Sequence, residues 1–271
     1  MSVKTNAGFS LVDILVGMVI ALLGVIIIFQ VFSVSEGIKR TTTSGGDAVQ
    51  SGAFSLFTLE RSLKMAGYGL FYSTNLPNVP PDPAANAIPV TITPGAGNNS
   101  DTIILRYRQN WEYGPFPPDT NSPSFATIVI PPVTVETITV NPLNAQLVSD
   151  LNGVIAEGIV LLKAEYGVDV NGDGVIQPNE WNQAAPAIVL SVLAVRLAVV
   201  ARSAQPEKPG VVGGACGTTT LASAGYPTWI DNANVPLNIT AGVGLVGDDW
   251  KCYRYKTFES TVPLRNVMWR P

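Results

Sequence analysis

Residues 8–34 read GFSLVDILVGMVIALLGVIIIFQVFSV, a long apolar run with one acidic residue near its start. From Ile14 to Val34 the run holds about 21 residues, polar only at Gln30 and Ser33. At about 1.5 Å per residue a helix of this length measures about 31 Å, which is close to the hydrocarbon thickness of a bilayer. Small residues inside the run permit close contact between helices, and these are Gly17, Ala21 and Gly24. The sequence therefore predicts a helix that can cross a membrane.

Two simpler interpretations of this segment are a secretory signal peptide and a plain single-pass anchor. A signal peptide has a shorter apolar run with a small-residue cleavage site after it, and no such site follows Val34. Asp13 argues against the plain anchor, because a carboxylate beside a bilayer core is costly and is usually functional or paired. No Lys or Arg lies within two helical turns of Asp13. We therefore expect its partner to be a positive charge from outside its own helix.

The run GFSLVD at residues 8–13 resembles the processing motif of type IV prepilins. The resemblance implies that a prepilin peptidase cuts after Gly8, removes the leader at residues 1–8, and methylates the new N-terminal residue, Phe9. In that family the fifth mature residue is normally Glu and pairs with the free amine of a neighbouring subunit. Here the matching position is Asp13, whose side chain is one methylene shorter. The resemblance also implies that Met1 lies in the cytoplasm and the head in the periplasm.

The resemblance divides the chain into four parts and implies an α+β, pilin-like fold, with a long N-terminal helix packed on a C-terminal antiparallel β-sheet head with long loops. After the leader, residues 9–35 would form the transmembrane and filament-core helix, residues 36–67 an amphipathic half, and residues 68–271 the periplasmic head. The run EGIKRTTTSGG at residues 36–46 favours helix only weakly, so we expect a kink or partial unwinding there. Asp47 is then a predicted N-cap and Gly67 a predicted stop signal.

The helix segment after Asp47 has apolar residues at three- and four-residue spacing, which predicts one apolar face directed at the sheet of the head. The positions on this face are Val49, Ala53, Leu56, Leu59 and Leu63. The stretches LERSLKMAGYG at residues 59–69 and ESTVPLRNVMW at residues 259–269 resemble parts of PilW-like proteins, which are minor pilins.

The head is predicted to be rich in strands and turns, because the chain contains 21 Pro and 25 Gly. Runs with β-branched and apolar residues mark the expected strands. These runs are Thr102–Arg108, Phe125–Ile130, Val133–Val140, Gly158–Val168, Leu193–Arg202, Tyr253–Phe258 and Ser260–Val267.

Residues 169–180 read DVNGDGVIQPNE and fit the calcium-loop pattern of EF-hands, D-x-[DN]-x-[DN]-G-x5-E. Calcium takes six to eight oxygen ligands, and alternate side chains converge when the chain curls at a glycine such as Gly174. The candidate ligands are Asp169, Asn171, Asp173, the Val175 carbonyl, Gln177 or a water, and Glu180. A strand rather than a helix precedes the loop, and Pro178 is expected to start a short helix over residues 179–183.

We expect a structural Ca2+ at this loop that orders the head. PilW-like proteins show a run similar to residues 166–174. The alternative is a turn rich in Asp, Asn and Gly that binds no metal.

The composition argues against several activities. The chain has no His, which removes Ser-His-Asp and Cys-His catalysis and every His-ligated metal site. No pair of carboxylates has a spacing that indicates acid–base chemistry, so we expect no enzymatic activity and no catalytic residues. Net charge is −4, from 16 basic and 20 acidic residues without a basic cluster, so nucleic acid is not an expected partner.

The two cysteines, Cys216 and Cys252, are too far apart in sequence to form a CxxC redox pair. In an exported domain they predict one disulfide that closes a loop of about 36 residues. The alternative is two free buried thiols.

Taken with the resemblance, these features predict a minor pilin. Its expected role is in the priming or tip complex of type IV pilus assembly. Its expected partners are other minor and major pilins, the prepilin peptidase, the pilus assembly platform and the inner membrane. It would be a single-pass inner-membrane protein before it joins the pilus at the cell surface. Alternatives are a type II secretion pseudopilin of the GspJ kind and an adhesin subunit at the filament tip.

Overall fold

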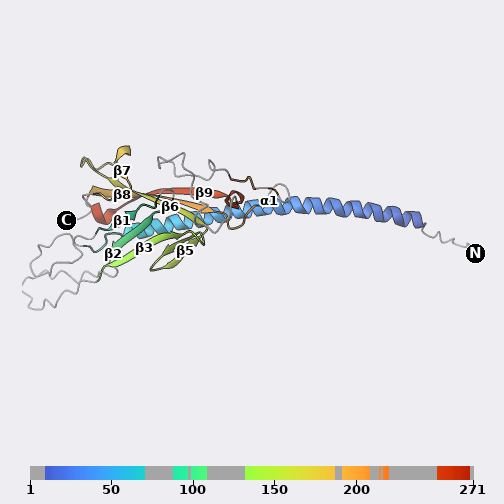
Figure 1. Ribbon diagram of the computed structural model, residues 1–271, viewed down its shortest axis with the longest axis horizontal. Helices are drawn as coiled ribbons and strands as arrows, with labels where there is room; N and C mark the ends of the chain where they lie inside the picture. The colour runs from blue at the N-terminus through green and yellow to red at the C-terminus, as the bar shows by residue number, and fades with distance from the viewer. Residues whose placement is uncertain are drawn as a thin grey trace, which may run out of the picture.

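The computed structural model describes residues 10–70, 88–96, 99–108, 132–186, 191–207, 214, 216–219 and 249–268. One long helix, α1, runs out of a head that is built mainly from β-strands (Figure 1). The N-terminal half of α1 projects from the head without a covering partner, and the C-terminal half lies along it (Figure 1). This arrangement confirms the predicted α+β class, with a long N-terminal helix followed by antiparallel sheets.

Helix α1 spans Leu11–Met65 as 55 continuous residues. The prediction of a break within residues 36–46 is therefore wrong, and Asp47 lies inside the helix rather than at an N-cap. Starting a helix is costly whereas extending one is cheap, so the three glycines of this run, at about 1 kcal/mol each, do not stop a helix that is already formed. The predicted stop is confirmed, since Ala66 is the C-cap and Gly67 follows with a φ of +80°.

The buried face of α1 agrees with the predicted one at Leu59 and Leu63, which are fully buried, but it is rotated from the prediction nearer to the N-terminus. Val49 and Ala53 are exposed, and Leu56 is only partly buried. The fully buried side chains on this half of the helix are Ser44, Ala48, Ser55, Leu59 and Leu63. Gly52 lies on the same face, and a Cβ atom there would meet the Phe258 ring at 2.1 Å. Small residues therefore define the contact face, because they let the helix backbone approach the sheet closely.

Two antiparallel sheets form the head. The first has the order β1-β2-β3-β4-β5 and the second the order β7-β6-β8-β9. The strands of the first sheet are β1 (Val90–Thr93), β2 (Thr102–Tyr107), β3 (Thr134–Asn141), β4 (Gln146–Ser149) and β5 (Gly153–Glu157). Those of the second are β6 (Ile159–Val168), β7 (Trp181–Asn182), β8 (Val192–Arg202) and β9 (Tyr255–Pro263). Short helices are η1 (Pro178–Glu180), η4 (Asp249–Cys252) and α2 (Arg265–Met268).

A single main core joins α1 to both sheets, and it includes Leu59, Ile103, Ile138 and Leu197. The central strands β6 and β8 are buried along most of their length. Some of their residues belong to the main core, and others pack in a smaller cluster around Trp250. This explains why both strands read as nearly continuous apolar runs rather than alternating ones.

Most of the strand predictions agree with the structure. The strands expected from residues 102, 133, 158 and 193 onward correspond to β2, β3, β6 and β8. Strands β1, β4 and β5 were not predicted, and the candidate at residues 125–130 lies outside the described residues. The two C-terminal candidates have the wrong bounds, because Tyr255–Pro263 is one strand where two were predicted. The second candidate also has the wrong type at its end, since residues 265–268 form the short helix α2. The expected helix at residues 179–183 is instead η1 followed by β7.

Candidate functional site

The N-terminal end of α1 is formed by a capping box. Ser10 is the N-cap, its Oγ accepts from the Val12 N–H at 3.4 Å, and its own N–H donates to Asp13 Oδ2 at 3.2 Å. Asp13 therefore satisfies a backbone donor at the positive end of the helix dipole. The sequence signal for this role is a Ser followed three residues later by an acid. The processing residues Gly8 and Phe9 lie outside the described residues.

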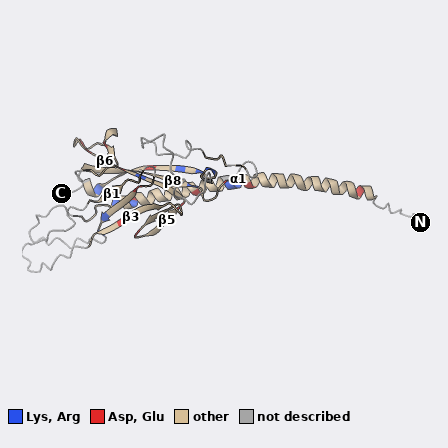
Figure 2. Cartoon of the chain, in the orientation of Figure 1, with Lys and Arg blue, Asp and Glu red and all other residues tan. Residues whose placement is uncertain are grey.

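The apolar half of α1 contacts almost nothing within the chain. Its most apolar 18-residue window has a mean hydropathy of 3.0 and is 0% buried, and α1 is the one helix in the described residues that is long and apolar enough to cross a membrane. Large side chains such as Ile20, Phe29 and Phe32 are each more than 60% exposed. Figure 2 shows an acidic position near the start of this segment and otherwise uncharged residues up to the head. Such a surface requires lipid or other apolar helices around it.

The exposed side of α1 remains apolar beside the head. Val49, Phe54 and Phe57 are 46%, 54% and 64% exposed. Charged residues are interleaved with them, including Lys64, which pairs with Glu60 at 3.3 Å. Glu60 also accepts from Ser260 on β9, and that hydrogen bond lowers the pKa of the Glu60 carboxyl. The helix thus presents aromatic rings to the outside while it is fixed to the sheet on its other face.

The calcium-type loop connects β6 to η1 and is organised by its own side chains. Asp169 accepts from three backbone N–H groups, those of Gly172, Asp173 and Gly174, at 2.7–3.2 Å. Asp173 Oδ1 accepts from the Val175 N–H at 2.8 Å, which holds the pKa of the Asp173 carboxyl below its usual value. Gly172 and Gly174 have φ of +77° and +79°, as the tight curl requires.

The six predicted ligand residues are brought onto one loop but not onto one point. Asn171 Nδ2 and Gln177 Nε2 both donate to Asp173 Oδ2, at 2.9 and 3.2 Å. Glu180 is buried and accepts from the Val170 and Gln177 N–H groups. Among the described residues, no three side chains of Asp, Glu, His or Cys form a group that could hold a metal. The donor set is rich in oxygen, which fits calcium chemistry. The amide groups of Asn171 and Gln177, however, direct their NH2 groups rather than their oxygens at Asp173.

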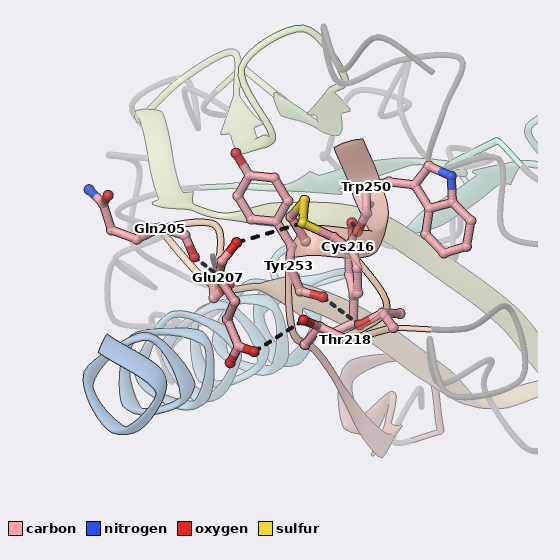
Figure 3. Close-up of a disulfide and its surroundings, with 10 residues drawn as sticks. Gln205, Glu207, Cys216, Thr218, Trp250 and Tyr253 are labelled. Atoms are coloured by element: carbon pink, nitrogen blue, oxygen red, sulfur yellow. Dashed lines mark hydrogen bonds between the residues drawn. A yellow bond between two sulfur atoms is a disulfide. The ribbon is translucent and has the colours of Figure 1, made fainter. Parts of the chain in front are cut away.

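The predicted disulfide between Cys216 and Cys252 is present, with 5.0 Å between the Cα atoms and a sequence separation of 36 (Figure 3). Contacts around it fix the chain on both sides. Thr218 Oγ1 donates to Glu207 at 3.1 Å, and Glu207 forms an ion pair with Arg254. The bond therefore ties the segment after β8 to η4 at the start of β9.

These observations define a class of protein: an α+β head carried on a long helix whose exposed apolar half is suited to a membrane or to a bundle of similar helices. The model of the PilW family, described as type IV pilus-assembly protein W, matches residues 139–266. This part of the chain is therefore similar to the PilW family of type IV pilus-assembly proteins, in line with the sequence motifs.

Among solved structures, a type IV-like pilin from Thermus thermophilus, TTHA1219, matches with a TM-score of 0.45 and 15% identity. The match covers 81% of this chain and 97% of that chain. No curated protein matches the sequence.

Proposed function

We propose that this chain is a minor pilin that takes part in the assembly of a type IV pilus, as a subunit of a priming or tip complex. The observation that carries the proposal is the division of one continuous helix into two halves. The apolar half begins beside a single acid and is wholly exposed, whereas the other half is packed on the head. A helix of this kind can rest in a bilayer first and later exchange lipid for the helices of other pilins.

Processing and register follow from the first residues of the chain. A prepilin peptidase would cut between Gly8 and Phe9 and methylate the new amine. Ser10 and Asp13 both remain after this cut, so the capping box survives maturation. The Asp13 carboxylate, exposed at the end of the helix, would also accept a charge-assisted hydrogen bond from the amine of a neighbouring subunit.

The exposed rings of Phe54 and Phe57 provide a second surface for neighbouring subunits, beside the head rather than in the filament core. The partners we propose are other minor and major pilins, the prepilin peptidase and the assembly platform. The chain would sit in the inner membrane with its head in the periplasm, and then in the pilus. A structural role accounts for all of these features without catalysis.

The mature N-terminus of the native protein tests this proposal. Mass spectrometry of the purified protein is expected to show a chain that starts at methylated Phe9. A Gly8→Leu variant should keep the leader and should be absent from sheared surface filaments. A native protein that retains Met1–Gly8, or that never appears in filaments or their assembly intermediates, would contradict the proposal.

We also propose that the loop at residues 169–180 binds one Ca2+ with a structural role. The ligands would be Asp169, Asn171, Asp173, the Val175 carbonyl, Gln177 and Glu180. In the structure, the side-chain NH2 groups of Asn171 and Gln177 donate to Asp173 Oδ2. These groups carry partial positive charge, and they occupy the side of the carboxylate where we expect the cation to bind. Asp173 is charged at neutral pH, as an ordinary aspartate is, and the hydrogen bond from the Val175 N–H lowers its pKa further.

Calcium at about 100 times its dissociation constant should stabilise the head by about 2.7 kcal/mol, or about 5–10 °C in Tm. Thermal unfolding with calcium and with excess chelator measures this shift. Asp173→Asn should abolish the shift, whereas the matched variant Asp150→Asn, exposed on another turn, should retain it. Equal Tm values with calcium and with chelator would show that the loop is a metal-free turn.

A further inference from the structure

A pocket of about 670 Å³ lies beside α1 where the helix leaves the head. One wall is a single face of α1 from Phe32 to Asp47, and the other includes Gln205, which follows β8. The pocket begins in the last turns of the apolar segment, which ends at Val34. Lys39 lies five residues further on, or about 7.5 Å along the helix. Because the headgroup layer is roughly 5–8 Å thick on each side of a bilayer, the pocket opens at the level of lipid headgroups.

The pocket contains an exposed cation and a half-buried anion whose charges are not matched nearby. Lys39 and Asp47 form no ion pair or hydrogen bond with any residue in the described ranges. The other two charges in the pocket, Arg40 and Glu36, pair with each other at 3.3 Å. The lining is therefore neutral overall. Glu36, which is paired with Arg40, is the charged residue nearest to the apolar segment, and of the two unpaired charges Lys39 lies nearer to the membrane and Asp47 farther from it.

Ser44 supplies an independent indication that something binds in the pocket. It is 2% exposed, lines the pocket, and its Oγ has no hydrogen-bond partner in the part of the chain that is described. Other hydroxyls on α1 satisfy themselves: Thr42, Ser55 and Thr58 each donate to the carbonyl four residues earlier. A buried hydroxyl without a partner is costly, so a polar group of a ligand in the pocket would relieve that cost.

We infer that this pocket binds the headgroup of a zwitterionic aminophospholipid while α1 is in the membrane. The phosphate would lie near Lys39 and Arg40, and Phe32 would contact the start of the acyl chains. The ammonium would point outward to the Ser44 hydroxyl and Asp47. A neutral lining whose unpaired cation, Lys39, lies nearer to the membrane than its unpaired anion, Asp47, matches a headgroup whose phosphate is inside and whose amine is outside. The inference rests on the membrane stage of the proposed function.

The test uses the full-length chain in nanodiscs that contain phosphatidylethanolamine, phosphatidylcholine and phosphatidylglycerol in equal amounts. Lipids retained after transfer to detergent are identified by native mass spectrometry. Phosphatidylethanolamine should be retained at least about tenfold over phosphatidylcholine, because the trimethylated amine cannot donate hydrogen bonds to Ser44 or Asp47. Lys39→Gln should remove most of this retention, whereas Arg61→Gln, an equal charge change on the same helix outside the pocket, should not.

Ser44→Ala should also weaken retention, whereas Thr42→Ala should not, because the Thr42 hydroxyl already donates to its own helix. Lys39 is exposed, so its variant remains informative even if Ser44→Ala folds poorly. Equal retention of the three lipids, or equal behaviour of Lys39→Gln and Arg61→Gln, would overturn the inference. Displacement of the lipid by inorganic phosphate or soluble glycerophosphoethanolamine would assign the pocket to a free phosphate compound instead.

Carbonate extraction of membranes separates this inference from the proposed function. A chain that carbonate releases from membranes would refute the membrane stage itself. A chain that stays inserted but shows no preference for phosphatidylethanolamine would refute only the lipid pocket.

Discussion

Replacing Asp101 with alanine is expected to lower the free energy of unfolding of the head by about 3–5 kcal/mol. Asp101 follows the turn between β1 and β2, and its side chain is 0% exposed. It forms an ion pair at 2.8 Å with Lys163 of β6, whose side chain is 5% exposed. Without the carboxylate, the Lys163 ammonium would remain buried and uncompensated.

The same carboxylate also joins the two sheets through backbone donors. Asp101 Oδ1 accepts from the Gly95 N–H at 3.0 Å, and Oδ2 accepts from the Ala164 N–H at 2.9 Å. Gly95 belongs to the turn after β1 in the first sheet, and Ala164 to β6 in the second. The substitution would therefore leave two backbone donors without their partner, which adds to the cost of the lost ion pair.

Urea unfolding of the full-length chain in detergent, followed by tryptophan fluorescence, measures this change. Asp150→Ala is the matched control: Asp150 is exposed and accepts one backbone hydrogen bond, from Thr137 at 2.7 Å, so its loss should cost about 1 kcal/mol. The double variant Asp101→Ala/Lys163→Met should lose less than the two single variants combined, because it leaves no buried charge. Strict additivity would mean that the ion pair contributes no coupling energy.

The parts of the fold that could be predicted are those with a strong local signal. Helix α1 begins with a long apolar run, and β6 and β8 are long runs of β-branched and apolar residues, so each is recognisable without its neighbours. Strands β4 and β5 have only four and five residues, and β5 has no fully buried residue. They exist because β4 pairs with β3 and β5 pairs with β4, and such pairing cannot be seen in a short segment.

The rotated face of α1 has a different cause. A count of apolar residues favours Val49 and Ala53, but the helix contacts the sheet through Gly52 and Ser55, which such a count treats as neutral or polar. Close approach of two backbones requires small residues, and this need appears only when Phe258 is seen against Gly52. Contacts between distant segments were hidden for the same reason, including Asp101 with Lys163, 62 residues apart, and the pocket between α1 and Gln205.

The site could be predicted in outline but not in its local detail. The motif at residues 8–13 indicated that Asp13 needs an external positive partner, and the hydrogen bond from the Ser10 N–H adds a local role for the same carboxylate. The two roles can be separated experimentally, because a helix cap needs only an acceptor, whereas pairing with an amine needs a negative charge.

Substitution of Asp13 with leucine is expected to reduce the amount of this subunit in sheared filaments by at least about tenfold, with no loss of membrane insertion. Leucine extends the apolar run, so the helix should still enter the bilayer. It removes the charge that would pair with a neighbouring amine, so the subunit should stall before assembly. Immunoblots of sheared filaments and of carbonate-washed membranes measure the two quantities.

Two further variants decide which role of Asp13 matters for assembly. Asp13→Asn keeps an oxygen that can accept the Ser10 N–H but removes the charge, and it should fail almost as completely as Asp13→Leu. Asp13→Glu keeps the charge on a longer arm and should assemble at least as well as the native chain. If Asp13→Asn assembled normally, Asp13 would act through the capping box alone, and the register of the subunit would have to be set by other contacts, such as those of Phe54 and Phe57. Charge, rather than hydrogen-bonding capacity, is therefore the property on which the proposed pairing depends.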